Sequence, residues 1–191
     1  PGIIREINVA TANQAQLNEQ SLSLEICDLQ DGDARAAYRN INYDMRMYKR
    51  LRMFVHAEQA RADMPLETGD LSCFIRLGSD FVDNYYEYEI PLEVTPWYTG
   101  DPNLIWPDAN AIDIEFRKLQ NLKLSRPIGY PLFQAYSELD ETARITVKGN
   151  PNLANVVTVM IGVRNLDRDD NPFAEDDGQP KCAVVWANEL R

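Results

Sequence analysis

Hydrophobic and polar residues alternate with a period of two through most of the chain. From Leu51 to Ala57 every second residue is apolar, which predicts a strand with one buried face and one mostly exposed face. The same alternation, or a run rich in β-branched residues, recurs at 71–77, 84–92, 143–148, 155–164 and 181–186, with weaker examples at 20–27 and 41–45. The pattern therefore predicts about eight strands.

The strand expected at 84–92 carries acidic residues at alternate positions. Tyr85, Glu87 and Glu89 fall on one face, opposite a face that carries Tyr86. A catalytic pair of carboxylates is defined by its separation across a cleft, and a sequence does not show that separation. We therefore expect Glu87 and Glu89 to be solvated.

One segment, 110–124, follows a helical rather than a strand period. Ile112, Phe116 and Leu119 are spaced roughly as on one face of a helix. We expect one short helix there, packed over one open end of a two-sheet structure. A weaker signal predicts a second helical turn near 32–39.

The expected fold is mostly β, a β-sandwich with one short helix. Residues suited to chain reversal separate the strands at 69–70, 78–80, 149–151 and 176–178. No repeat or linker divides the chain, so residues 1–191 are expected to form a single domain. Segments 44–55 and 185–191 resemble the jelly-roll modules that bind carbohydrate, which predicts a jelly-roll-like sandwich of the galactose-binding kind.

The composition and charge of the chain argue against two classes of binding partner. The chain has 191 residues, with 30 acidic and 19 basic side chains and a formal net charge of -11. A protein that binds nucleic acid or anionic lipid needs a basic surface to neutralise phosphates, so neither is an expected partner. The longest apolar run, 156–163, is far shorter than the roughly 20 residues of a membrane-spanning helix.

Both ends of the chain point to a fragment. The first residues, from Pro1 to Glu6, include no initiator methionine and no signal-peptide pattern, and Arg191 closely follows a predicted strand. We expect the chain to be one domain excised from a longer protein.

The three cysteines are far apart. Cys27, Cys73 and Cys182 form no CxxC pair, so no zinc site is expected. Each lies within an alternating apolar pattern, which favours three small buried thiols. One disulfide with one cysteine left over is the alternative.

Catalytic motifs are missing from the sequence. His56 is the one histidine, and its position on the polar face of the strand at 51–57 favours a surface or rim location. The chain has no GxSxG elbow, no glycine-rich phosphate loop and no HExxH motif. We therefore expect no catalytic residue, no cofactor and no enzymatic activity.

An acidic loop and an aromatic loop are the two candidate binding segments. Residues 167–178 carry six carboxylates, which could hold Ca²⁺, but their spacing does not match an EF-hand, and a solvated loop is favoured. In the proline-rich segment 95–107, Trp97, Tyr98 and Trp106 could form a stacking platform for a sugar ring. Anchoring of the loop to its own domain is the favoured alternative.

A closer resemblance covers nearly the whole chain. Several ordered phrases resemble the SprA/Sov family of gliding and secreting Bacteroidetes: LNEQSL (17–22), DGDARAAY (31–38), MFVHAE (53–58), FIRLGSD (74–80), NYYEYEIPL (84–92), IWP (105–107), KGNP (148–151) and GVRN (162–165). The resemblance implies that the parent protein is the outer-membrane translocon of the type IX secretion system. Members of that family form a very large β-barrel whose pore passes folded cargo.

The resemblance also implies a place and partners for the chain. It would be a soluble, non-catalytic structural and interaction domain in the extramembrane cap of the barrel, with no direct membrane insertion of its own. The extracellular side of the outer membrane is favoured, and the periplasmic side is the alternative. The implied partners are the remainder of the parent β-barrel polypeptide, secretion-system proteins such as PorV and a plug protein, and secreted cargo.

A second hypothesis comes from the loop and the jelly-roll pattern. The chain would then be a carbohydrate-binding module of a cell-surface protein, using Trp97, Tyr98 and Trp106 or the sheet face that carries Tyr85.

Overall fold

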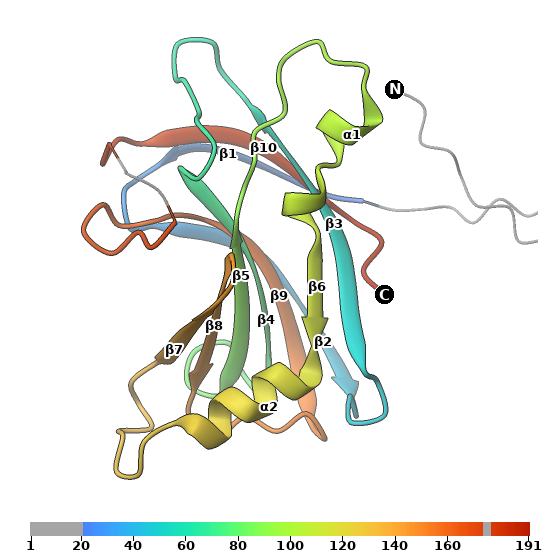
Figure 1. The fold of residues 1–191 in the computed structure, drawn as a ribbon, viewed down its shortest axis with the longest axis vertical. Coiled ribbons are helices and arrows are strands. Elements are labelled where there is room, and N and C mark those ends of the chain that lie inside the picture. Colours follow the sequence, from blue (N-terminus) through green and yellow to red (C-terminus); the bar gives the residue numbers. More distant parts are fainter. Residues whose placement is uncertain (1–20, 174–176) are drawn as a thin grey trace, which may run out of the picture.

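Two antiparallel sheets pack face to face in the computed structural model, which describes residues 21–173 and 177–191 (Figure 1). The four-stranded sheet has the order β1 (Leu22–Leu29), β10 (Lys181–Asn188), β3 (Arg50–Gln59) and β6 (Ile112–Glu115). The six-stranded sheet has the order β2 (Ala34–Tyr43), β9 (Val156–Asn165), β4 (Leu71–Gly78), β5 (Tyr85–Pro91), β8 (Ala143–Lys148) and β7 (Tyr136–Asp140). The predicted mostly β sandwich is confirmed, whereas the jelly-roll type stays a prediction.

The inward faces of the two sheets form one hydrophobic core. In β3 the predicted alternation holds, because Leu51, Met53, Val55 and Ala57 are all buried. Alternate residues of β4, such as Ile75, face them from the other sheet. Burial of these apolar faces against each other supplies the main driving force for the two-layer structure.

The predicted helix forms, but it begins later than expected. Helix α2 (Phe116–Ser125) follows directly on β6, and it packs against β8 across the lower end of the view in Figure 1. Ile112 and Ile114 are buried at alternate positions of β6, which pairs with β3. The first apolar residues of segment 110–124 therefore belong to a strand. Two short helical turns, α1 (Pro102–Ile105) and η1 (Asp108–Asn110), precede it.

Two strand predictions differ from the structure. The helical turn expected near 32–39 is wrong, because that segment forms most of β2 and pairs with β9 from Ala34–Arg164 to Tyr43–Val156. Strand β7 lies on the far edge of the same sheet and was not expected. For β2, pairing with a strand distant in sequence overrides local propensity, whereas β7 forms a local hairpin with the predicted strand β8.

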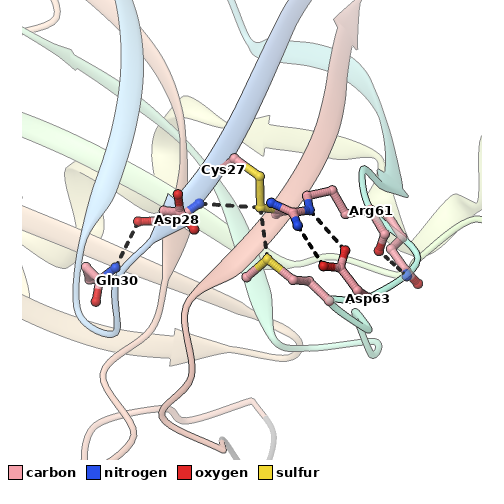
Figure 2. Close-up of a disulfide and its surroundings, with 8 residues drawn as sticks. Cys27, Asp28, Gln30, Arg61 and Asp63 are labelled. Carbon is pink, nitrogen blue, oxygen red and sulfur yellow. Dashed lines mark hydrogen bonds and ion pairs between the residues drawn. A yellow bond between two sulfur atoms is a disulfide. The ribbon is translucent and has the colours of Figure 1, made fainter.

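A disulfide joins the first and the last strand. Cys27 on β1 and Cys182 on β10 are bonded, although 155 positions separate them in the sequence (Figure 2). Met64 lies beside the bond, with its Sδ 3.3 Å from Cys182 Sγ. The expectation of three free thiols is therefore wrong for two of them, because the register of β1 and β10 brings these residues together. Cys73 is free and buried, and burial, with a smaller contribution from Glu89, raises the pKa of its thiol to about 12.

Replacing both bonded cysteines by serine should lower the free energy of unfolding by about 2–5 kcal/mol, because the bond closes a long loop in the unfolded chain. Urea unfolding measures this loss, with the reduced wild-type chain expected to match the double variant. The denatured, unreduced wild type should react with one equivalent of a thiol reagent, from Cys73. Reaction with three equivalents would contradict the bond.

The turn between β4 and β5 depends on Asp80. Its Oδ1 accepts hydrogen bonds from the backbone N–H groups of Val82, Asp83 and Asn84 at 3.0, 2.6 and 3.0 Å. Burial alone would raise the pKa of Asp80, but these bonds and the Asn84 amide outweigh it and lower the pKa to about 2. Gly78 lies so close to this turn that a Cβ there would approach Asn84 O to 2.1 Å.

Because the pKa of Asp80 is lowered by folding, its carboxylate stabilises the fold above pH ~4, and this contribution is lost as the pH falls towards 2. Wild type should therefore be more stable than Asp80→Asn at pH 6, and the difference should shrink between pH 4 and pH 2. Urea unfolding at several pH values measures this. The exposed Asp169→Asn variant is the matched control, and a difference that does not depend on pH would contradict the assignment.

Candidate functional site

An open apolar groove lies between the two sheets where the edge strands β1 and β2 face each other. It has a volume of about 650 Å³. Its apolar walls come from both sheets and include Leu22, Ile41, Met53 and Ile161. Each of these lies on an inward strand face, so the groove is an unfilled extension of the core.

The groove follows the free edge of β2. Strand β2 pairs with β9 on one side and is the last strand of its sheet. Three successive residues, Ala37, Tyr38 and Arg39, line the groove, although consecutive residues of a strand point to opposite faces. The backbone edge of β2 therefore forms part of the groove wall, along with its inward side chains.

Exposed aromatic residues surround the groove. Tyr38, Tyr43 and Tyr48 are 57–59% exposed, and Leu190 is 47% exposed. Met47, in the turn between β2 and β3, is 87% exposed. Tyrosine and arginine are the residue types enriched at protein interfaces, so this rim differs from an ordinary solvated surface.

Cations gather next to the groove despite the acidic composition of the chain. A second hollow, of about 470 Å³, shares Tyr48 and Arg50 with the groove and is also lined by Lys49 and Arg117. Arg50 is paired with Asp113 and Glu115, at 3.2 and 2.5 Å. Arg39, Lys49 and Arg117 are exposed and form no ion pair with any described residue.

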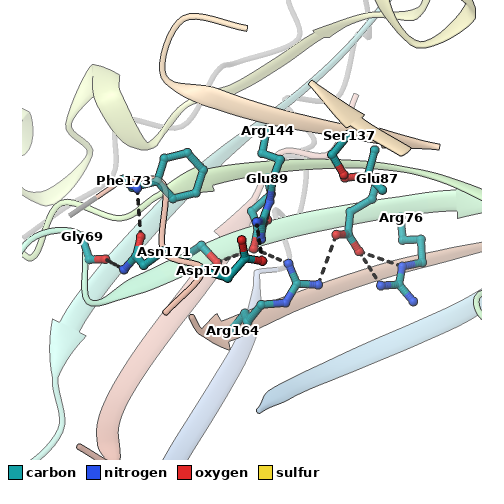
Figure 3. A network of polar contacts seen from close by, with 12 residues as sticks. Gly69, Arg76, Glu87, Glu89, Ser137, Arg144, Arg164, Asp170, Asn171 and Phe173 are labelled. Atoms are coloured by element: carbon teal, nitrogen blue, oxygen red, sulfur yellow. Dashed lines mark hydrogen bonds and ion pairs between the residues drawn. The ribbon is translucent and has the colours of Figure 1, made fainter. Parts of the chain in front are cut away.

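A ladder of charged residues lies on the outer face of the six-stranded sheet, on its four central strands β9, β4, β5 and β8 (Figure 3). Glu87 accepts hydrogen bonds from Arg76 (2.5 and 2.8 Å) and Arg164 (3.1 Å). Glu89 accepts from Arg144 (2.7 Å), from Arg164 and from the Ser72 hydroxyl (2.6 Å). The ion pairs therefore form a chain in the order Arg76, Glu87, Arg164, Glu89, Arg144.

The strand register sets this order. Glu87 lies opposite Arg76 of β4, and Glu89 lies opposite Arg144 of β8. Burial alone would lower the pKa of Arg164, but the charges of Glu87 and Glu89 outweigh it and raise that pKa. The Arg164 guanidinium also lies over the Phe74 ring, 4.7 Å from its centroid.

The expectation that Glu87 and Glu89 are solvated is wrong. Glu87 is 4% exposed and Glu89 is fully buried, because the three arginine side chains lie over them. Their shared face was predicted correctly. Their arginine partners occupy polar positions in the patterns of the other strands. The sequence therefore shows where these arginines are, but only the strand register shows which of them meet the two glutamates.

The three aromatic residues of the 95–107 loop do not form one continuous stacking surface. Trp97 and Tyr98 are neighbours whose rings are 6.2 Å apart and nearly perpendicular, so they do not form one flat surface for a sugar ring. Trp97 Nε1 donates to Gln59 O at 3.0 Å, and Tyr98 is 99% exposed. Trp106 is half-buried and packs on His56 instead. As a ligand site these three residues stay a prediction, and two of them anchor the loop.

His56 is buried, so its expected surface location is wrong. Its ring lies between Trp106 and Trp186. The Thr95 hydroxyl donates to Leu104 O, so His56 Nδ1–H donates to Thr95 Oγ1 at 3.1 Å and to Ile105 O at 2.8 Å. These contacts hold the 95–106 segment over the outer face of the four-stranded sheet.

The acidic loop lies partly outside the described residues, since Glu175 and Asp176 are not among them. Of the others, Asp177 pairs with Lys181 at 3.0 Å, and Asp170 approaches Arg144 at 3.8 Å. Among residues 21–173 and 177–191 no group of three or more histidine, cysteine or acidic side chains could hold a metal ion. Calcium binding at 167–178 therefore stays a hypothesis.

Comparison with protein families assigns the chain. Residues 1–191 match the family model SprA_N, described as motility related/secretion protein. The chain belongs to the SprA_N family. A comparison with curated proteins gives no match.

Membership of the SprA_N family confirms the resemblance on which the secretion hypothesis depends. It supports a role related to motility or secretion and an association of the SprA_N chain with the cell envelope. None of the helices in the described part of the chain has the length and hydrophobicity needed to cross a membrane.

In this SprA_N chain, Glu89→Gln should lower the free energy of unfolding by about 3 kcal/mol, because it leaves Arg144 and Arg164 facing each other without a shared anion. Removing one partner of a buried ion pair typically costs about 3–5 kcal/mol, and we expect the lower value because both arginines keep some contact with solvent. Urea unfolding at neutral pH measures it. The exposed Glu25→Gln variant is the control, and equal stability of the two variants would contradict the ladder.

Proposed function

We propose that this chain is a non-catalytic structural and interaction domain of the type IX secretion system outer-membrane translocon. It contributes to protein export and gliding motility as part of the extramembrane cap of the barrel, on the extracellular side of the outer membrane. The match of the SprA_N family to all 191 residues carries this proposal.

The arrangement of the surfaces supports an interaction role. Parts of both outer sheet faces are covered by the chain's own residues, one by the arginine and glutamate ladder and the other by the 95–106 segment. The groove beside β2 is in contrast open and lined by apolar residues. Contacts with the rest of the parent polypeptide, with PorV or a plug protein, or with secreted cargo would use such a surface.

The placement of the polar residues supports a non-catalytic role. The nucleophile, base and acid of an enzyme must reach a substrate, and a free pair of groups in a cleft is the usual sign. Here Glu87 and Glu89 are ion-paired under arginines, and His56 of β3 donates a hydrogen bond to a carbonyl group of the 95–106 segment.

Deletion of this domain from the parent protein should impair export of secreted proteins or the permeability barrier of the outer membrane, with the barrel still present in the membrane. Cargo in the medium and entry of a large antibiotic measure the two effects. Normal export with an intact barrier would contradict the proposal.

Paired point variants separate this function from sugar binding. Replacing Tyr43 and Tyr48 by alanine alters the groove rim, whereas replacing Trp97 and Tyr98 alters the exposed aromatic loop. We expect the first pair to reduce export several-fold and the second to leave it unchanged. The reverse result would favour a carbohydrate-binding module.

A further inference from the structure

We infer that the groove beside β2 binds an extended polypeptide segment, which adds a strand to the free edge of β2 and carries acidic residues at one end. The inference rests on the proposed interaction role and names the surface and the kind of partner. Its observations are the free strand edge, the apolar alternation inside the groove, and the unpaired cations beside it.

The free edge supplies the backbone partners. Among the described residues β2 pairs with β9 alone, so alternate N–H and C=O groups on its other side have no strand beside them. Such an edge is a template for another extended chain. The regularly paired part of β2, from Ala34 to Asn40, gives an edge of about 20 Å before the register shifts, which corresponds to a partner segment of six or seven residues.

The groove wall supplies selectivity for alternating side chains. An added strand would turn every second side chain towards Ile41, Met53 and Ile161, which are apolar. Its remaining side chains would face outward, near Tyr38. The groove therefore favours a segment with an apolar residue at every second position.

The cations beside the groove indicate that one end of the partner segment is acidic. Arg39 lines the groove, and Lys49 and Arg117 line the hollow next to it. None of the three is paired with a described carboxylate, although the chain as a whole has a net charge of -11. Acidic residues on one end of the partner would pair with these cations without displacing an internal ion pair.

The choice of a polypeptide over a lipid follows from the edge strand and the rim. An acyl chain would fill the apolar volume but would leave the β2 backbone groups without partners. Tyr38, Tyr43 and Tyr48 form the kind of rim that protein interfaces use.

Fluorescence anisotropy of labelled ten-residue peptides with the whole 191-residue chain tests the inference. The first set alternates apolar and polar residues and ends in three glutamates. A second set replaces these glutamates by lysines, and a third places prolines at two central positions, which blocks strand pairing. We expect the first set to bind at least tenfold more tightly than the other two.

Two variants test the two parts of the site. Ala37→Trp places an indole in the groove and should reduce binding of the first set at least tenfold, whereas Ile128→Trp, at a fully exposed site outside the groove, should not. A Lys49→Glu and Arg117→Glu double variant should lose the preference for glutamate over lysine. Arg61→Glu, at an exposed residue outside both hollows, is the charge control. Unfolding curves show that each variant is folded.

Several outcomes would overturn the inference. Equal binding of the proline set would exclude strand addition, and equal binding to wild type and Ala37→Trp would exclude the groove. Binding of dodecyl phosphate without binding of any peptide would assign the groove to an amphiphile. Self-association that Ala37→Trp abolishes, again without peptide binding, would assign it to a second copy of the chain. Because the deletion experiment is done in the parent protein, failure of peptide binding leaves its result unaffected.

Discussion

Both sheets depend on strands from the C-terminal part of the chain. Strand β10 lies between β1 and β3, and β9 lies between β2 and β4. Without them the first four strands would have no partner in either sheet except for the short pairing of β3 with β6 and that of β4 with β5. The Cys27–Cys182 bond lies at one of these junctions and fixes the pairing of the first strand with the last. Long-range pairings of this kind make folding slow relative to local hairpins, because a large loop must close before any contact forms.

The charged residues are unevenly distributed over the surface. Three arginines lie where the six-stranded sheet has no second layer, and there Arg76, Arg144 and Arg164 cover buried glutamates and Phe74. Gly162 permits this, since a Cβ there would lie 2.4 Å from the Phe74 ring. Arginine suits this role because its planar group can bind two carboxylates and stack on a ring at once. The acidic excess is left to the loops and the exposed edges.

Period-two alternation predicts most of the strands that form the core, with β6 as an exception, but it does not predict which strands are neighbours. Glu87 and Glu89 were placed on the correct face, yet their burial follows from Arg144 and Arg164, which lie 55 and 75 positions away from Glu89. The same limit explains the disulfide and the buried His56. The groove could not be predicted either, because it arises from the way two sheet edges diverge, which no local pattern encodes. The helix is predicted in type but not in its start, because Ile112 fits the helical period with Phe116 and Leu119 as well as the strand period with Ile114.

The free thiol in the middle of the sheet has a consequence for how the chain is oxidised. Three cysteines allow three single bridges, and two of these involve Cys73. Only the thiolate attacks another sulfur, and burial in β4 keeps the Cys73 thiol protonated and out of reach. If the six-stranded sheet forms before oxidation, one pairing is left and the correct bridge forms without any isomerase. If an oxidant acts first, two of the three products trap a central strand of the six-stranded sheet in the wrong place, so the yield of native protein is decided by the order of these two events.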